Sequence, residues 1–354
     1  MSEAVFPPPP SSNPRLFGHA RAEQTWLRAW RAGRLPHAWL LTGPKGVGKA
    51  TLAYRLARAY LAGLVAEPAW HDPAAAVFRM VANRAHPDLL ILEPREGKNG
   101  PIERKVEDVR DALEGLYRTS AAGRRICLID DADTALNRHG ENTLLKVLEE
   151  PPPGLVFLLV AQRPGGLLPT IRSRCAALRL APLPERDMAA ALRHLASPDG
   201  EELGRLAELG EGSPGRALAL GALDWSGAYA ELLRALPAGG DAGRLRALMA
   251  ATRLLESGGF RGATTVLAVL LRRLVRQGLA RPPTRELFAG EAAALATAAT
   301  APGGSLDRRL AVWEEFAALA ERVEAVNLDP LQALLRVAIG LGAPAEAGPA
   351  RDIA

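Results

Sequence analysis

Residues 43–50 read GPKGVGKA and match a phosphate-binding loop at every position but the last. The pattern needs a glycine, four residues, Gly-Lys, and then serine or threonine. Gly43, Gly48 and Lys49 satisfy it, and Gly46 lies between them. In such a loop the backbone N–H groups surround phosphates at a helix N-terminus, and the lysine reaches the outer ones. Ala50 has no hydroxyl for magnesium, so the motif predicts nucleotide binding and argues against hydrolysis. The alternative is a glycine turn that binds nothing.

Two aspartates, Asp130 and Asp131, directly follow the apolar run ending at Ile129. An acid at the end of a strand beside a phosphate loop can hold magnesium, and in ATPases of this type a glutamate usually follows it. Asp131 is one methylene shorter than glutamate, so the pair is a degenerate Walker B motif, or simply two acids at a strand end. Thr51 is a candidate to replace the missing loop hydroxyl, but one helical step of about 100° turns its side chain elsewhere.

An arginine suited to phosphate chemistry occurs much later, at Arg174 in the tripeptide Ser-Arg-Cys. An arginine there can stabilise charge that develops on a transferring phosphate, including a phosphate bound to a neighbouring subunit. The tripeptide alone has little specificity, and a solvated arginine is the default interpretation.

The elements that would position these residues alternate between apolar strands and amphipathic helices. Such alternation predicts a parallel sheet covered by helices on both faces, and three consecutive prolines after residue 150 end one of the helices. The predicted strands are 39–42, 89–92, 125–129 and 156–161, and the predicted helices are 50–64, 103–118 and 137–149.

After about residue 181 the strand-like runs disappear, and alanine, leucine and arginine dominate. We therefore expect an α/β domain followed by helical domains. The expected division is a disordered proline-rich leader at 1–14, a nucleotide-binding-type domain at 15–181, a small helical unit at 182–223, a longer helical bundle at 224–342 and a flexible tail at 343–354.

Composition narrows the function classes. The net charge of +5 permits contact with nucleic acid, but there is no dense basic run, and aromatic residues at 5% argue against single-strand stacking platforms. The two cysteines, Cys127 and Cys175, form neither a disulfide framework nor a CxxC zinc pair. His71 and His86 without a thiol make a weak metal site. There is no signal-peptide pattern or membrane-spanning run, so the expected compartment is the cytoplasm.

Longer motifs occur in a characteristic order along the chain. They are GRLPHAWLLTGPKGVGKATLA, HPDLLIL, RICLIDDAD, NTLLKVLEEPPPGLVFLLV, LLPTIRSRC, GSPGRAL and NLDPLQALL. Together they resemble the bacterial clamp-loader family of AAA+ proteins from about residue 16 to residue 341. The NTLLKVLEEPP and SRC motifs, in this order and spacing, are highly specific.

The resemblance implies an AAA+ domain, a small helical lid and a collar that joins five subunits in a ring. That ring opens the sliding clamp of DNA polymerase III and loads it on primed DNA. The implied partners are the gamma/tau and delta subunits through the collar, and the clamp and DNA through the ring. The family's SRC arginine faces the ATP of the next subunit, so the resemblance makes Arg174 a trans arginine finger.

Several family positions are altered in this chain. Ala50 replaces the loop hydroxyl, and Asp131 replaces the glutamate. The first sensor threonine corresponds to Ala161, followed by Gln162. The second sensor arginine corresponds to Gly215, with Arg216 one residue late. The family's four zinc cysteines are missing between residues 64 and 85, so we expect no zinc.

These substitutions favour an assembly subunit that hydrolyses little or no ATP, with ATP or ADP binding left open. An active gamma/tau-like motor ATPase is the alternative within the family. A P-loop kinase is a third possibility, which explains neither the SRC motif nor the helical C-terminal third.

Overall fold

The computed structural model describes residues 8–63, 69–97, 100–102, 106–117, 123–222, 225–237, 240–283, 285–300, 305, 307–308, 310–312, 314–315 and 329–341. The chain divides into two compact units. The N-terminal unit comprises Met1–Pro198 and Glu211–Arg216, and the C-terminal unit comprises Asp199–Gly210 and Ala217–Ala354. The expected division into leader, α/β domain, lid, collar and tail stays a prediction, because these units do not test it.

A five-stranded parallel sheet forms the centre of the N-terminal unit, in the order β2-β5-β6-β1-β7. Its strands are β1 (Ala38–Thr42), β2 (Leu89–Leu92), β5 (Arg125–Ile129), β6 (Leu155–Ala161) and β7 (Ala176–Arg179). β6 is buried along its whole length, as expected for a strand covered on both faces. A two-stranded antiparallel hairpin, β3 (Arg95–Gly97) and β4 (Gly100–Ile102), is separate from this sheet. The predicted α/β fold is confirmed, and the structure adds β7 at one edge.

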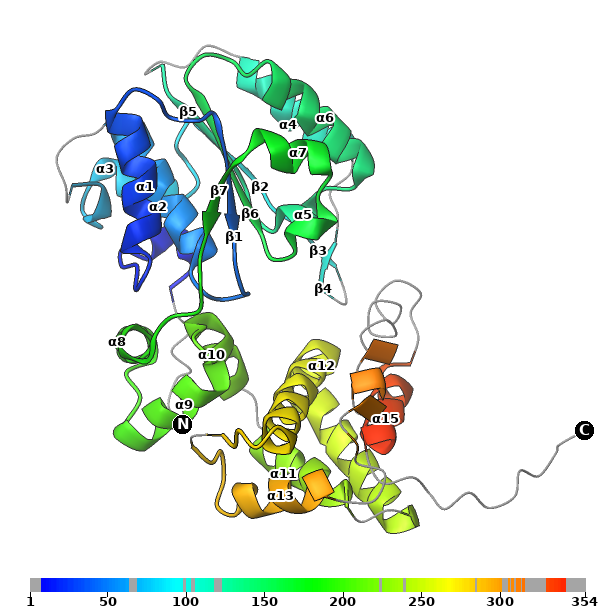
Figure 1. Cartoon of the computed structure of the whole chain (residues 1–354). Helices are drawn as coiled ribbons and strands as arrows, with labels where there is room; N and C mark the ends of the chain where they lie inside the picture. Colours follow the sequence, from blue (N-terminus) through cyan, green and yellow to red (C-terminus); the bar gives the residue numbers. More distant parts are fainter. Residues whose placement is uncertain are drawn as a thin grey trace, which may run out of the picture. The chain divides into compact units, whose positions relative to one another are not determined.

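Helices cover both faces of the sheet (Figure 1). On one face lie α1 (Ala20–Arg31) and α2 (Lys49–Ala62), and on the other α4 (Val106–Glu114), α5 (Ala132–Ala135) and α6 (Arg138–Glu149). Successive side chains of β1 alternate between the two cores: Leu41 packs with α1 and α2, and Leu40 with the α4–α6 side. This period of two, on a strand that is apolar throughout, fixes the sheet between the helical layers.

The remaining elements of the N-terminal unit are short, apart from α8. They are η1 (Pro10–Ser12), η2 (Ala69–His71), α3 (Ala76–Ala82), η3 (Gly115–Tyr117), η4 (Pro164–Gly166), α7 (Pro169–Arg174) and α8 (Glu185–Ala196). Within the predicted helix at 103–118, the described residues form α4 up to Glu114 and then the separate turn η3.

Part of the expected proline-rich leader, residues 11–14, contacts helix α2, while residues 1–7 lie outside the described part. Ser11 and Asn13 are buried. The fully buried guanidinium of Arg58 donates to the carbonyls of both residues, at 2.8 and 3.1 Å. Arg55 likewise donates to the carbonyl of Pro14 at 2.7 Å. Two arginines of α2 thus satisfy backbone groups of a segment that composition alone marks as mobile.

The resemblance places the family's zinc-binding cysteines between residues 64 and 85. The described part of this segment packs through aromatic side chains. Trp70 of η2 and Phe78 of α3 are buried, and Arg58 stacks over the Phe78 ring at 4.4 Å. His71 Nε2 lies 2.7 Å from Arg55 Nη2, and burial lowers the pKa of His71 to about 3. His71 is therefore a neutral acceptor for an arginine. No metal-binding group of three His, Cys, Asp or Glu side chains exists among the residues described, and the expectation of no zinc stays a prediction.

Helices make up most of the described part of the C-terminal unit, and no strand occurs among its described residues. Its helices are α9 (Gly200–Gly210), α11 (Ser226–Ala235), α12 (Gly240–Gly278), α13 (Glu291–Thr300) and α15 (Pro330–Leu341), and α10 (Pro214–Gly221) begins in the N-terminal unit and ends in this one. α12 changes direction at Gly259, whose φ of 60° and ψ of −172° are not helical. In the described residues no single helix has the length and apolar character to cross a membrane, although the two segments of α12, bent by 119°, meet those limits as a pair. The expected flexible tail at 343–354 lies outside the described residues.

One buried polar network holds the C-terminal core together. Arg273 donates to Glu291 at 2.7 and 2.8 Å and to Glu208 at 2.9 Å. Glu291, which is fully buried, also accepts from the hydroxyl of Tyr229 at 2.6 Å and from the amide of Leu287 at 2.6 Å. Because each carboxylate oxygen of Glu291 has two donors, the buried charge is both paired and hydrogen-bonded.

Candidate functional site

The phosphate loop connects the carboxyl end of β1 to the first turn of α2, which is the order that the motif requires. Gly43 and Gly48 have φ of 150° and 111°, which side chains rarely tolerate. At Gly43 a Cβ would also lie 2.3 Å from the carbonyl oxygen of Leu180. Ala50 and Thr51 are in the first turn of α2 and are partly buried. The loop therefore has its expected shape, while its ability to bind nucleotide stays a prediction.

Lys49 is directed at its own loop. Its ammonium group donates to the carbonyls of Gly43 and Pro44, both at 2.9 Å, and the residue is only 5% exposed. Burial lowers the pKa of Lys49, while the charges of Asp131 and Asp130 oppose that shift. The two carbonyls accept hydrogen bonds from ammonium N–H groups that would otherwise donate to a bound phosphate.

A segment distant in sequence covers the loop, which sequence analysis did not predict. The hydroxyl of Ser213 donates to the carbonyl of Lys45 at 2.6 Å, and the amide of Gly215 donates to the carbonyl of Gly46 at 3.0 Å. A Cβ on Gly46 would meet the amide nitrogen of Arg216 at 2.7 Å. The glycine at the position that the resemblance assigns to the second sensor was the available signal, because a small residue permits close backbone approach.

Arg216, which follows the altered sensor position, is half-buried and bonds to Glu211 at 3.0 Å. Burial lowers its pKa, with Glu211 opposing the shift. Among the residues that the structure describes, its Nε and Nη2 atoms have no hydrogen-bond partner.

The acid pair lies at the end of β5 as expected. Asp130 accepts a hydrogen bond from the amide of Asp131 at 3.0 Å, and burial, reinforced by the charge of Asp131, raises the pKa of Asp130 to about 6. Asp131 has the left-handed φ of 44°. The backbone at this position is therefore strained, which is common at functional sites.

Gln162, one residue beyond the first sensor position, contacts this pair. Its side-chain amide donates to Asp131 Oδ1 at 2.9 Å, and its backbone amide donates to Asp133 at 3.2 Å. Ala161 itself is fully buried. The polar group that faces the acids thus comes from Gln162, and no pattern in the sequence pointed to this contact.

His19 joins the loop from the segment before α1. Its Nε2 lies 2.9 Å from the carbonyl oxygen of Val47, and burial lowers its pKa. A neutral imidazole that donates to Val47 supports the loop without adding a charge to it.

Arg174 lies at the other end of the sheet from the phosphate loop. It is the last residue of α7, and β7 begins two residues later with Ala176 paired to Trp39, near the start of β1. The loop begins at Gly43, beyond the end of β1. Four strand residues at about 3.3 Å each separate the two levels by roughly 13 Å. The structure therefore does not bring Arg174 together with Lys49 and the acid pair.

Two acceptors hold the Arg174 guanidinium at the surface. Nη1 donates to the carbonyl of Thr170 at 3.1 Å, and Nη2 donates to Glu149 Oε1 at 2.7 Å. The side chain is 36% exposed. Burial raises the pKa of the adjacent Cys175 to about 12, so this thiol is a packing group. Burial raises the pKa of Cys127 as well.

Residues 18–184 match the family described as DNA polymerase III, delta subunit. That range contains the phosphate loop, the acid pair and Arg174. The resemblance to clamp loaders is thereby confirmed for this part of the chain.

Relatives of the delta-prime type support the same assignment. The chain is 38% identical over 201 residues to the DNA polymerase III subunit delta' of Pseudomonas aeruginosa, covering 53% of this chain and 57% of that one. It is 35% identical to the subunit delta' of Escherichia coli, covering 55% and 60%. The DNA polymerase III subunit gamma of Buchnera aphidicola is 30% identical, with 54% and 51% covered. The chain spans between half and three-fifths of these relatives.

Among solved structures, a gamma subunit-related protein of DNA polymerase III from Thermotoga maritima is 21% identical, with a TM-score of 0.43, over 89% of this chain and 98% of that one. A point mutant of RuvB from the same organism is 20% identical, with a TM-score of 0.38, over 58% and 61%.

Proposed function

We propose that this chain is a delta-prime-type subunit of the bacterial clamp loader, acting in the cytoplasm. It helps to assemble the ring that loads the sliding clamp on primed DNA, with gamma/tau and delta subunits as its partners through the C-terminal collar. It hydrolyses little or no ATP and supplies Arg174 to the ATP site of a neighbouring subunit.

The observation that carries the proposal is the separation of Arg174 from the chain's own phosphate loop. The Arg174 side chain is exposed, and its residue lies about 13 Å along the sheet from the level of that loop. An arginine finger must contact the transferring phosphate, so this one can serve only a phosphate bound by another molecule.

The state of the chain's own loop supports weak hydrolysis. Ala50 offers no hydroxyl, Lys49 bonds to loop carbonyls, and the segment at Ser213–Arg216 contacts the loop backbone. Catalytic groups that act as a unit in phosphoryl transfer are not additive, so the loss of one of them removes most of the rate that the others support. Entry of a nucleotide, ATP or ADP, requires Lys49 to change partners.

The test is Arg174→Ala in the assembled ring, with Arg172→Ala as the matched control. Both arginines are exposed on α7. A finger supplied in trans contributes about 10³ to 10⁵ in rate, so Arg174→Ala should abolish turnover at the neighbouring site while the ring still assembles. Unchanged ATP hydrolysis stimulated by clamp and primed DNA would refute the finger assignment.

A gamma/tau-like motor ATPase is the second candidate, because gamma and tau subunits are also among the relatives, at 30% and 34% identity. It predicts brisk ATP hydrolysis by the purified chain that Lys49→Ala abolishes. A titration of labelled nucleotide, with and without magnesium, separates binding from hydrolysis.

A further inference from the structure

The carboxylate of Glu149 makes the shortest contact of the Arg174 side chain, 2.7 Å from Nη2. We infer that Glu149 is a positioning residue. It holds the Arg174 guanidinium in the orientation in which its remaining N–H groups can donate to a phosphate bound by a neighbouring subunit. The inference rests on the proposed function of Arg174 and adds a second residue to the same site.

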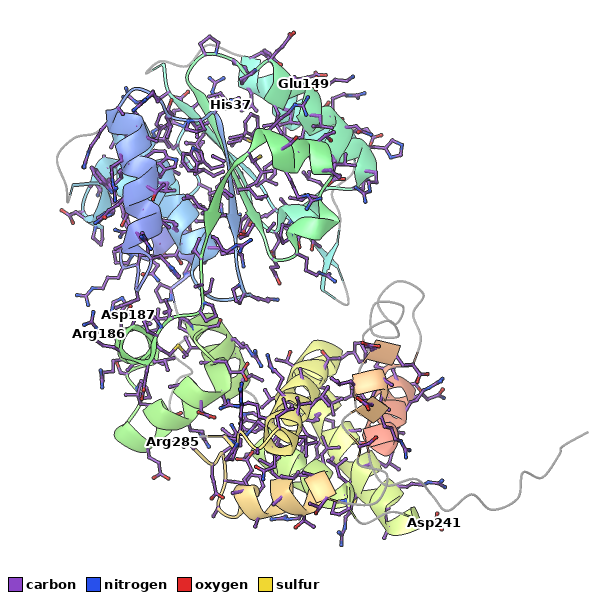
Figure 2. The ribbon with its side chains drawn as sticks, in the orientation of Figure 1. His37, Glu149, Arg186, Asp187, Asp241 and Arg285 are labelled. Carbon is purple, nitrogen blue, oxygen red and sulfur yellow. The ribbon has the colours of Figure 1, made fainter. Side chains whose placement is uncertain are left out.

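Glu149 stands on an anchored element. It is the last residue of α6, and the preceding carbonyl, that of Leu148, lies 3.1 Å from Nε2 of His37, just before β1. Figure 2 shows Glu149 and His37 at the same end of the N-terminal unit. The amide of Glu150 donates to the carbonyl of Lys146 at 3.3 Å, and Pro151 prevents the helix from continuing. The carboxylate is thus presented from a fixed helix end.

Arg174 stands on a helix that is tied to the same α6. The buried carboxylate of Glu141 accepts from the amide of Leu168, at the start of α7, at 3.0 Å. Ile171 of α7 is fully buried in the core that α6 shares. With α6 and α7 docked, the Glu149–Arg174 contact sets the orientation of the guanidinium rather than the position of its helix.

The contact leaves the guanidinium free to act. Arginine has five N–H donors, and Thr170 and Glu149 engage two of them. Three donors remain for phosphate oxygens. Glu149 is 54% exposed, and exposed ion pairs contribute only about 0.2 to 1 kcal/mol. The charge of Glu149 therefore neutralises the finger weakly, and its main effect is to limit the rotamers of a long side chain.

Three variants in the assembled ring test this role, with Arg174→Ala as reference. Glu149→Ala should lower kcat for ATP hydrolysis by about three- to five-fold. This factor is the rate equivalent of the upper part of the range given above for an exposed ion pair. KM for ATP should change by less than about twofold, because positioning acts in the transition state. Glu149→Gln keeps an oxygen acceptor and should restore most of kcat. Glu150→Ala, an exposed neighbour, should leave kcat unchanged.

The thermal midpoint of the free chain should be the same for all three, so that a lost rate reports orientation and not folding. If Arg174→Ala abolishes turnover but Glu149→Ala leaves kcat unchanged or raises it, the positioning role is wrong and the finger stands. If Glu149→Gln is as slow as Glu149→Ala, the charge and not the anchoring matters, and the inference also fails. If Arg174→Ala itself has no effect, the proposed function fails, and the role of Glu149 with it.

Discussion

The amide of Gly215 donates a hydrogen bond to the carbonyl of Gly46 at 3.0 Å, and the two backbones are in van der Waals contact. A Cβ on Gly215 would lie 2.8 Å from Cα of Gly46 and 3.0 Å from its carbonyl oxygen. Position 215 is where the clamp-loader resemblance places the second sensor arginine. A side chain at position 215 does not fit without a shift of backbone, so the close contact of this segment with the phosphate loop depends on the glycine.

Gly215→Ala should destabilise the N-terminal unit by about 1 to 3 kcal/mol, the usual cost of overpacking, because both atoms that its Cβ would meet belong to backbone. Urea unfolding of the intact chain measures the effect. Gly165→Ala is the matched control, since a Cβ there has nothing within 4 Å. Equal stability of the two variants would mean that the segment does not rest on the loop.

Ala50→Thr should not create an ATPase. The restored hydroxyl would supply a ligand for magnesium and nothing else. Asp131 would remain a short acid bonded to Gln162, and Lys49 would remain bonded to the loop carbonyls. We expect phosphate release by the purified variant to equal that of the Ala50→Thr, Lys49→Ala double variant. Rapid turnover that depends on Lys49 would show that the missing hydroxyl was the sole defect.

Asp130→Asn should stabilise the protein at neutral pH. The pKa of Asp130 rises from 3.8 in the unfolded chain to about 6 in the fold, mainly because of burial. Between these values the folded state binds more protons than the unfolded state, so wild-type stability falls as pH rises through this window. The variant, which cannot ionise but still accepts from the Asp131 amide, should gain about 1 to 3 kcal/mol above pH 6.

The gain from Asp130→Asn should vanish below about pH 4, where Asp130 is protonated in both states. Urea unfolding at pH 4 and pH 7.5 measures the difference. A gain of the same size at both pH values would contradict an ionised, buried Asp130.

Glu291→Ala should destabilise the C-terminal unit by about 3 to 5 kcal/mol, since it leaves the buried Arg273 with Glu208 as its one remaining carboxylate partner in the described network. Tyr229 would lose its acceptor as well. Thermal unfolding is the readout, with the exposed Glu256→Ala as control, expected within about 0.5 kcal/mol. If both variants unfold alike, the network does not hold this core.

Sequence was sufficient for the parallel sheet, the loop between β1 and α2, and the separation of an α/β part from a helical part. Those features follow from local pattern: apolar strands with period two, helices with period 3.6, and glycines where φ is positive. The types of the altered residues, Ala50, Asp131 and Gly215, also needed no structure, because a missing hydroxyl or a shortened acid is visible in the letters.

Tertiary structure decided what contacts what. The burial of Ser11 and Asn13 depends on an arginine more than 40 residues away, and a proline-rich composition does not record that partner. The contacts of Gly215 with Gly46 and of Glu149 with Arg174 join segments separated by 169 and 25 residues. Local propensity carries no information on such pairs, because they form only when the sheet brings distant chain segments to one place. The sequence alone could propose Arg174 as a finger, but only the register of β7 against β1 shows that it lies away from the chain's own phosphate loop.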